Sequence, residues 1–420
     1  MSTQRVQVQA VLSGVADRPW LLADVAASVA VFLYVLSLFK FVVRDPLGND
    51  LGFQGPLEAL LIGLSFVLSL VACVVRRVTL PSLGALLMLI YALFALLSSV
   101  NSFYPSLSAV KGLLLVLTVG IAIGTSSAIG ARAVITRFYW SMLAMIGLGL
   151  LVSLLLPGIF PLFRVDDTLR NRLWLFNNHP GVVADYVAVL LLLGLIAQPK
   201  PPVVFQVGLL MLNFAAGGRS SIVGLVGLLI LGYVWNSWQN LGVFVKRSAY
   251  LFTILFVSAL ILGLAILLVE PLRTGVRYLI DRTFLEASSV NGRTIIWAYA
   301  LSLIRKYPIL GLGPDGARDI FLREYVWASN AHNGYLEILL AAGWIGGGAF
   351  FLGWLLTMLR VRHLRDRRDL VAVTLIHCYL VILGVIGGLI APNFTVGLFI
   401  IVILAYFTRS DSSYGKIEAR

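Results

Sequence analysis

Charged residues are scarce in this sequence. Aspartate, glutamate, lysine and arginine make up 12% of its 420 residues, hydrophobic residues make up 60%, and the mean hydropathy is +0.95. A soluble domain of this length needs more polar surface than that to cover its core. The composition therefore excludes a soluble globular protein. It predicts an integral membrane protein in which residues 1–420 form a single polytopic membrane domain.

Acidic residues, histidines and cysteines are also few: 19 acids stand against 32 lysines and arginines, with four histidines and two cysteines. Cys73 and Cys378 lie far apart, within apolar runs, and fit neither a metal cluster nor a disulfide framework. The sequence has no GxxxxGKS/T, HExxH or GxSxG motif and no GxGxxG motif after a strand. We therefore expect no cofactor and no metal. The net charge of +13 indicates membrane topology rather than nucleic acid binding.

Apolar runs of about the 20 residues that cross a bilayer recur along the whole chain. Between the ninth and tenth runs lies a large outer loop, residues 270–332, which we expect to contain short amphipathic helices. The sequence predicts an all-α integral membrane protein with about 12 transmembrane helices. The predicted spans are Leu21–Val43, Pro56–Val75, Pro81–Val100, Ser108–Ala128, Val134–Leu156, Gly181–Ala197, Pro202–Ala215, Ser220–Trp235, Leu251–Val269, Asn333–Leu359, Leu370–Leu389 and Phe394–Phe407.

The distribution of basic residues predicts the orientation. With the N-terminus inside, inner segments contain 17 of the 32 lysines and arginines and the short outer loops contain five. Orientation follows the short loops, since long loops cross a membrane largely regardless of charge. Both termini are therefore expected in the cytoplasm. Arg5 and Arg18 precede the first span without a small-residue cleavage site, so no removable signal peptide is expected.

Arginines on the outer side run against this bias. Because guanidinium groups bind phosphate oxygens bidentately, they predict an anion site; the alternative is a solvated rim that faces lipid headgroups. Arg219 follows two glycines where a helix is expected to begin, and free N–H groups at such a place favour anions. The alternative is that Arg219 extends to the headgroups. The outer arginines of interest are Arg164, Arg170, Arg172, Arg219 and Arg293.

His332 lies at the end of the long loop, where the next span begins. A helix N-terminus disfavours the imidazolium ion, so His332 is a candidate proton acceptor; the alternative is a polar residue that only assists the helix end. His179 before Pro180 is a rival on the outer side. Asp185 within a span is a further candidate, expected to pair with an arginine. The adjacent Asp166 and Asp167 are metal ligands, an acid/base pair or a solvated turn, and His363 and His377 are expected to be structural.

Four motifs between residues 217 and 348 resemble the O-antigen ligase/polymerase family, and most closely its exopolysaccharide-polymerase branch. They are Gly292-Arg293-Thr294 with Trp297, Pro308 with Gly311-Leu312-Gly313, the run Ala331–Glu337 that reads AHNGYLE, and Gly343 with Gly346. The many spans and the large outer loop before a late histidine agree with this resemblance.

The resemblance implies a metal-independent, inverting glycosyltransferase with a GT-C-like fold. It would act at the periplasmic face of the bacterial inner membrane on undecaprenyl-pyrophosphate-linked glycans. By this resemblance Arg219 and Arg293 bind the donor pyrophosphate and His332 lies beside the acceptor hydroxyl. The NGYLE run favours a polymerase of exopolysaccharide or O-antigen. The alternative is an O-antigen ligase that transfers the polymer to lipid A-core, and a lipid-linked sugar transporter or flippase ranks third. Expected partners are the donor, a glycan or lipid A-core acceptor, the lipid bilayer and other polysaccharide-assembly proteins, but no nucleic acid.

Overall fold

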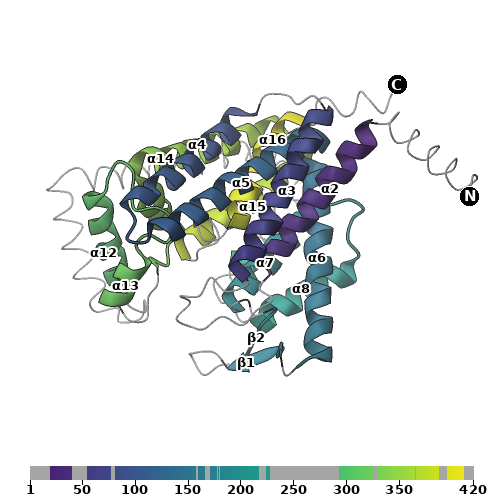
Figure 1. Ribbon diagram of the computed structural model, residues 1–420. Helices are drawn as coiled ribbons and strands as arrows, with labels where there is room; N and C mark the ends of the chain where they lie inside the picture. Colours follow the sequence, from purple (N-terminus) through teal and green to yellow (C-terminus); the bar gives the residue numbers. More distant parts are fainter. Residues whose placement is uncertain are drawn as a thin grey trace, which may run out of the picture.

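The structure, a computed structural model, is helical almost throughout (Figure 1). It describes residues 19–39, 54–76, 81–157, 159–165, 171–176, 178, 180–216, 224–227, 293–325, 330–364, 366–386 and 395–410. Seven described helices are long and apolar enough to cross a membrane, and three shorter apolar helices accompany them. The predicted helical membrane protein is therefore confirmed. The number of about twelve spans stays a prediction, because Leu251–Val269 and most of Ser220–Trp235 lie outside the described residues.

The first half of the chain forms long antiparallel helices. The elements are α2 (Pro19–Ser37), α3 (Gln54–Arg76), α4 (Leu83–Leu97), the 3₁₀ helix η1 (Ser98–Asn101), α5 (Pro105–Ile129) and α6 (Ala131–Leu155). Helix α3 packs against α2 and α5, and α4 packs against α5. Gly130, with φ of 83°, makes the single-residue turn between α5 and α6, a conformation for which glycine has no steric penalty.

The second half begins with a small hairpin and ends in the centre of the bundle. The elements are β1 (Phe163–Val165), β2 (Asn171–Leu173), α7 (Pro180–Leu193), α8 (Val203–Ala216), α12 (Arg293–Lys306), α13 (Arg318–Glu324), α14 (Gly334–Arg360), the 3₁₀ helix η2 (Val361–His363), α15 (Arg367–Ile386) and α16 (Thr395–Ser410). The strands β1 and β2 pair antiparallel. Helices α12 and α13 fall within the predicted outer loop and lie together at one end of the molecule (Figure 1).

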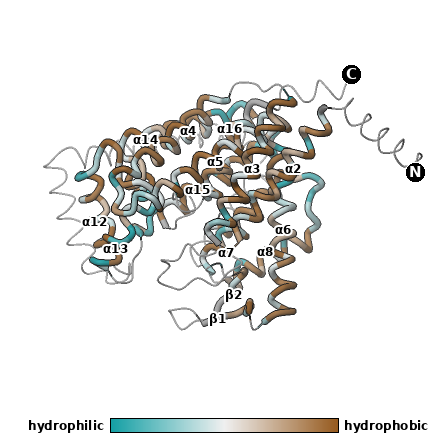
Figure 2. The backbone as a smooth tube through the Cα atoms, in the orientation of Figure 1, coloured by the Kyte–Doolittle hydropathy of each residue, from teal (hydrophilic) through white to brown (hydrophobic). Residues whose placement is uncertain are grey.

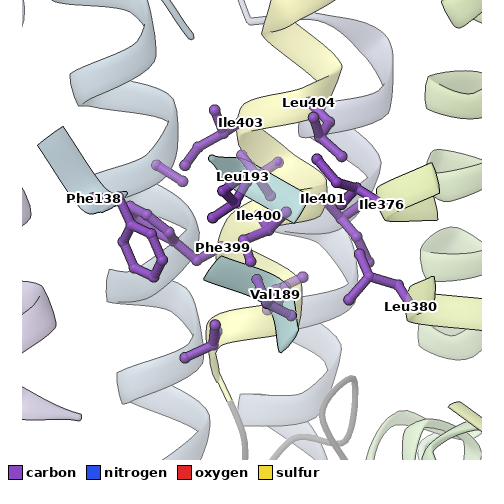
Figure 3. Packing of buried hydrophobic residues seen from close by; sticks show 14 of the residues in the cluster. Phe138, Val189, Leu193, Ile376, Leu380, Phe399, Ile400, Ile401, Ile403 and Leu404 are labelled. Carbon is purple, nitrogen blue, oxygen red and sulfur yellow. The ribbon is translucent and has the colours of Figure 1, made fainter. Parts of the chain in front are cut away.

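Helix α16 lies at the centre of the bundle. Every residue from Val396 to Phe407 is buried, as expected for a helix that is apolar on all sides. Side chains from α6, α7 and α15 converge on it (Figure 3). Tyr34 of α2 stacks on Phe399 with ring centroids 4.2 Å apart, and its hydroxyl group bonds to Oγ1 of Thr395 at 3.0 Å.

The periphery shows the opposite pattern, because large apolar side chains point outward. On α3, Leu60 is 66% exposed and Val74 is 78% exposed. Figure 2 shows hydrophobic residues along the outside of most long helices, whereas hydrophilic residues gather at α13 and the loops. Exposed apolar area of this extent requires a bilayer to cover it.

Ion pairs and loop contacts distinguish two ends of the bundle. Arg132 at the start of α6 pairs with Asp369 near the start of α15, and Nη2 of Arg137 lies 2.6 Å from Oδ1 of Asp24 on α2. We call these four residues the ion-paired end. The opposite end, at η1 and the start of α5, meets the chain between α12 and α13. We call it, together with α12, α13 and the turn before α14, the loop end, residues 98–111, 293–325 and 330–337.

Candidate active site

The chain turns sharply just before α14 begins. His332 occupies the left-handed region, with φ of 49°, which residues with a Cβ rarely adopt. Asn333 returns to extended backbone and caps α14: its Oδ1 accepts hydrogen bonds from the N–H groups of Tyr335 at 3.0 Å and Leu336 at 3.2 Å. His332 therefore lies directly before a helix N-cap, and its side chain is half-buried.

Side chains from α12 and α14 hold the backbone of this turn. Nε1 of Trp297 donates to the carbonyl oxygen of Ala331 at 3.0 Å, and the N–H of Ala331 donates to Oε1 of Glu337 at 2.5 Å. The N–H of His332 donates to Oδ1 of Asn330 at 2.9 Å. The N–H and C=O groups of Ala331 and the N–H of His332 are thus paired. Helices α12 and α14 therefore hold the backbone from which the imidazole of His332 extends.

Helix α14 is interrupted within its apolar stretch. Gly343 has φ of 61° and ψ of −165°, a region that is open almost only to glycine. The predicted span Asn333–Leu359 is confirmed as a helix long enough to cross a membrane, and it is broken at Gly343. The break is possible because the loop between α12 and α13 satisfies backbone groups that an unbroken helix pairs internally. Three hydrogen bonds join the loop to the break: Leu312 N–H to Leu340 O at 2.6 Å, Gly313 N–H to Ala341 O at 3.0 Å, and Trp344 N–H to Pro308 O at 2.7 Å.

Glycine is required on both sides of this joint. Gly311 has φ of 75°, and a Cβ there would lie 2.5 Å from the carbonyl oxygen of Leu340. A Cβ on Gly343 would collide with the carbonyl oxygen of Ile309. Two of the sequence motifs, the one that begins at Pro308 and the one that begins at Gly343, are therefore explained by the close approach of two backbones.

The same loop is anchored to the end of α4 and the start of α5. Lys111, which the sequence places within a span, forms an ion pair with Asp315, and a charged side chain at such depth usually needs a partner of this kind. Three further bonds reach backbone carbonyl groups of the loop: Ser108 Oγ to Pro314 O at 2.5 Å, Asn101 Nδ2 to Gly311 O at 3.1 Å, and Ser98 Oγ to Leu310 O.

Helix α13 joins this body through aromatic side chains. Tyr299 of α12 packs edge-on against Phe321, with ring centroids 5.8 Å apart, and against Tyr325 at 5.7 Å. The hydroxyl group of Tyr104 donates to the carboxylate of Asp319, and this hydrogen bond raises the pKa of Tyr104. The loop end is therefore one packed unit that supports the turn of His332.

Arg293, a predicted donor-binding residue, is the first residue of α12. It lies one helical turn before Trp297, whose indole binds the turn of His332, and its side chain is half-buried. The structure thus brings Arg293 and His332 to the same end of the molecule. Their roles in chemistry remain predictions.

The other predicted arginines fall on the hairpin and beyond α8. Arg164 and Arg172 face each other in the register of β1 and β2. Strand β2 packs against α7 and α8, and α8 ends at Ala216, three residues before Arg219. Arg219, Arg170, His179, Asp166 and Asp167 lie outside the described residues, as do the side chains of Arg164 and Arg172.

Asp185 lies on α7 with a half-buried side chain, and its predicted pairing with an arginine stays a prediction. Of the two histidines expected to be structural, His377 is buried and accepts a hydrogen bond at Nδ1 from Nε1 of Trp354 at 3.0 Å, and His363 is exposed in η2. In the described part of the chain, no three His, Cys, Asp or Glu residues lie close enough together to hold a metal ion.

Sequence reasoning gave no role to Glu337, Trp297 or the pair of Lys111 and Asp315. The first two belong to the motifs, where a carboxylate and an indole nitrogen within apolar surroundings signal a need for hydrogen-bond partners. The pairing of Lys111 with Asp315 joins residues 204 positions apart, and nothing local in the sequence indicates it.

These features define a polytopic helical membrane protein with a supported histidine at one end of its bundle. Residues 204–351 match the family model described as O-antigen ligase, which supports the predicted resemblance to the O-antigen ligase/polymerase family. The closer resemblance to the exopolysaccharide-polymerase branch stays a prediction. The matched segment, about a third of the chain, includes α12, α13, the turn of His332 and the break at Gly343. A search of curated proteins finds no match.

Proposed function

We propose that this protein is a membrane glycosyltransferase that joins undecaprenyl-pyrophosphate-linked repeat units into an exopolysaccharide or O-antigen polymer. The main support is the turn of His332. It lies within the segment that matches the O-antigen ligase model, and α12 and α14 hold its backbone through side-chain hydrogen bonds. A histidine held in this way before a helix N-cap is suited to take a proton from a bound hydroxyl group.

The proposed reaction is a single displacement. The acceptor hydroxyl oxygen forms a bond to the anomeric carbon of the donor while the bond from that carbon to pyrophosphate breaks. Undecaprenyl pyrophosphate leaves with the bonding electron pair, and the hydroxyl proton passes to the imidazole of His332. One displacement inverts the anomeric configuration.

Negative charge develops on the leaving pyrophosphate, so preorganised cations lower the barrier. We assign this role to Arg219 and Arg293, with Arg164, Arg170 and Arg172 as secondary candidates. Arg293 is suited by its place on α12, one turn before Trp297. Guanidinium groups bind phosphate oxygens bidentately, and we infer that they act here without a metal ion.

An O-antigen ligase is the second candidate, and the description of the matching family model favours it. A ligase uses the same donor and the same chemistry but transfers the finished polymer to lipid A-core. The NGYLE run that contains Glu337 favours the polymerase.

A transporter or flippase fits the structure less well. Transporters use the free backbone groups of broken helices to bind their cargo near the middle of the membrane. Helix α14 is broken at Gly343, but Leu312 and Gly313 already occupy the carbonyl groups of Leu340 and Ala341. The break is therefore a joint between two parts of the protein.

The proposed site is periplasmic and both termini are cytoplasmic, in a bacterial inner membrane. We test this with single cysteines at Arg323, exposed on α13, and at Arg362, exposed in η2, after replacing Cys73 and Cys378. A membrane-impermeant maleimide should label position 323 in whole cells and position 362 only after lysis. Labelling of position 362 from outside would reverse the orientation and move the site to the cytoplasm.

The polymerase is tested by the products of a strain that lacks the gene. Single repeat units attached to their acceptor indicate that polymerisation is lost. Intact polymer that remains on the lipid carrier indicates a lost ligase instead. Loss of both polymer and single transferred repeat units, together with lipid-linked repeats trapped on the cytoplasmic side, would identify a flippase.

A further inference from the structure

Glu337 is a buried carboxylate to which the proposed reaction assigns no role. Its residue is 8% exposed, and other acids of the described chain with buried side chains are Asp369 and Asp315, whose side chain is 6% exposed and pairs with Lys111. Asp369 has Arg132 as its ion-pair partner, whereas Glu337 forms no ion pair within the described chain; its Oε1 accepts the N–H of Ala331 at 2.5 Å. The carboxyl group of Glu337 therefore binds backbone beside a candidate catalytic residue rather than a cation of the described chain.

The N–H of Ala331 belongs to the peptide group between Asn330 and Ala331, and it donates to Glu337 of α14. The next peptide group, between Ala331 and His332, is held separately: its carbonyl oxygen accepts from Trp297 of α12 and its N–H donates to Oδ1 of Asn330. Side chains therefore hold the two consecutive peptide groups that lead into His332. His332 then adopts φ of 49°, which a residue with a Cβ keeps only when its surroundings impose it. Glu337 is the side chain of α14 that holds the first of these two peptide groups.

We propose that Glu337 is a positioning residue that fixes the backbone of His332, and through it the direction of the imidazole toward the acceptor hydroxyl group. The inference rests on the proposed glycosyl transfer and extends it by one residue. Since Glu337 acts as an acceptor for Ala331, the role requires an oxygen at the reach of a glutamate side chain and does not require its negative charge.

The competing possibility is that Glu337 only stabilises the start of α14, where a carboxylate favours the helix dipole. That role would change the amount of folded protein and leave the turnover of each folded molecule intact. The two possibilities therefore differ in kcat, measured on purified and correctly folded protein.

The test uses full-length protein in detergent or liposomes, with lipid-linked repeat units extracted from a strain that lacks the gene. Glu337→Ala should lower kcat about 10²-fold, the size of effect expected when a catalytic group is misplaced by about 1 Å, with KM for the donor unchanged within about twofold. Glu337→Gln keeps an oxygen acceptor at the same reach and should lose less than about tenfold. Glu337→Asp is one methylene shorter and should resemble Glu337→Ala. The matched control is Glu324→Ala, at an exposed glutamate of α13.

A double variant decides whether Glu337 acts through His332. The variant that combines His332→Ala with Glu337→Ala should turn over as slowly as His332→Ala alone. Once the imidazole is gone, Glu337 has no catalytic group left to position. Two results would overturn this inference and leave the proposed function intact. In one, the fold losses in kcat of the two single variants multiply in the double variant. In the other, Glu337→Ala has the wild-type kcat while His332→Ala is impaired. A wild-type protein that transfers no sugar from the donor would overturn both. If Glu337→Ala does not accumulate, the Gln and Asp variants decide, and equal kcat values for those two would refute the positioning role.

Discussion

The two ends of the bundle use polar side chains for different purposes. At the ion-paired end, charged groups of neighbouring helices bind one another: Arg132 pairs with Asp369 and Arg137 with Asp24. At the loop end, one ion pair, Lys111 with Asp315, accompanies many bonds from side chains to backbone. The side chains that bind backbone there include Ser98, Asn101, Ser108, Trp297, Asn333 and Glu337.

The difference follows from what each end contains. Regular helices pair their own backbone groups, so the ion-paired end needs partners mainly for charged side chains. The loop end contains chain that is not helical, and in apolar surroundings each of its N–H and C=O groups needs another partner. Most polar residues of the loop end are accounted for by this need. In the proposed function, His332 is the residue of this end that takes the proton from the acceptor hydroxyl group.

The largest expected effect is therefore at His332. Removing a positioned base costs about 10²–10⁴-fold in rate, so His332→Ala and His332→Gln should abolish detectable polymer in cells while the protein accumulates normally. His332→Asn separates the base from the backbone, because asparagine tolerates the left-handed conformation that the turn requires. It should be as inactive as His332→Ala and bind donor normally, as measured by turnover and donor binding of purified protein.

His179→Ala is the control for these variants and should be milder. An inactive His179→Ala enzyme beside a near-normal His332→Ala enzyme would reverse the two roles and move the acceptor site to residues 163–180. Activity in both variants would make Asp166 and Asp167 the leading candidates and reduce His332 to an accessory of the helix end.

The sequence predicted the helical spans better than it predicted the non-helical chain of the loop end. Hydropathy located ten spans that the structure shows as helices, because the bilayer imposes length and composition on each span separately. The motif also located His332 before a helix start. The break at Gly343 was missed, since a helix rich in glycine looks continuous in a hydropathy pattern. Its cause, the loop at Pro308–Gly313, lies about thirty residues away in sequence and becomes visible only in three dimensions.

The second largest effect is expected at Arg219, to which we assign binding of the donor pyrophosphate. Removing one preorganised group that stabilises developing charge costs about 10²–10³-fold. Arg219→Ala should lose activity in this range. Arg219→Lys should lie between it and the wild type, because lysine keeps the charge and lacks the bidentate fork. Polymer length in cells and kcat of purified protein measure both.

The matched control for Arg219 is Arg323→Ala, at an exposed arginine of α13 that should be near wild type. Normal polymer in Arg219→Ala cells would make this residue a headgroup anchor. The donor site would then be rebuilt around Arg293 or around Arg164, Arg170 and Arg172.

A smaller effect on activity is expected at Gly343, where the loop end depends on backbone conformation and not on a reacting side chain. Gly343→Ala forces a residue with a Cβ to φ of 61° and against the carbonyl oxygen of Ile309. Strain of this kind costs about 1–3 kcal/mol, so we expect a lower unfolding temperature and less protein in the membrane. Gly348→Ala is the control on the same helix, since a Cβ there meets no atom within 4 Å. Equal unfolding temperatures of the two variants would mean that the contact between α14 and the loop at residues 308–313 contributes little to stability.

The smallest effect on catalysis is expected at the ion-paired end, where charges support the fold alone. Arg132→Ala removes the cation from Asp369, whose side chain is 5% exposed, and also the guanidinium that lies 5.4 Å from the ring centroid of Phe407. Removing one partner of a fully buried ion pair costs about 3–5 kcal/mol, and the cost here is smaller because the side chain of Arg132 is 30% exposed. Thermal stability should therefore fall while kcat of the folded enzyme stays at the wild-type value. Adding Asp369→Asn should recover part of the stability, because it removes the charge that Arg132→Ala leaves behind. Arg368→Ala, at the exposed neighbouring position, should change neither quantity. If Arg132→Ala lowered kcat as much as Glu337→Ala, the two ends would be coupled. The ion-paired end would then contribute to catalysis as well as to the stability of the fold.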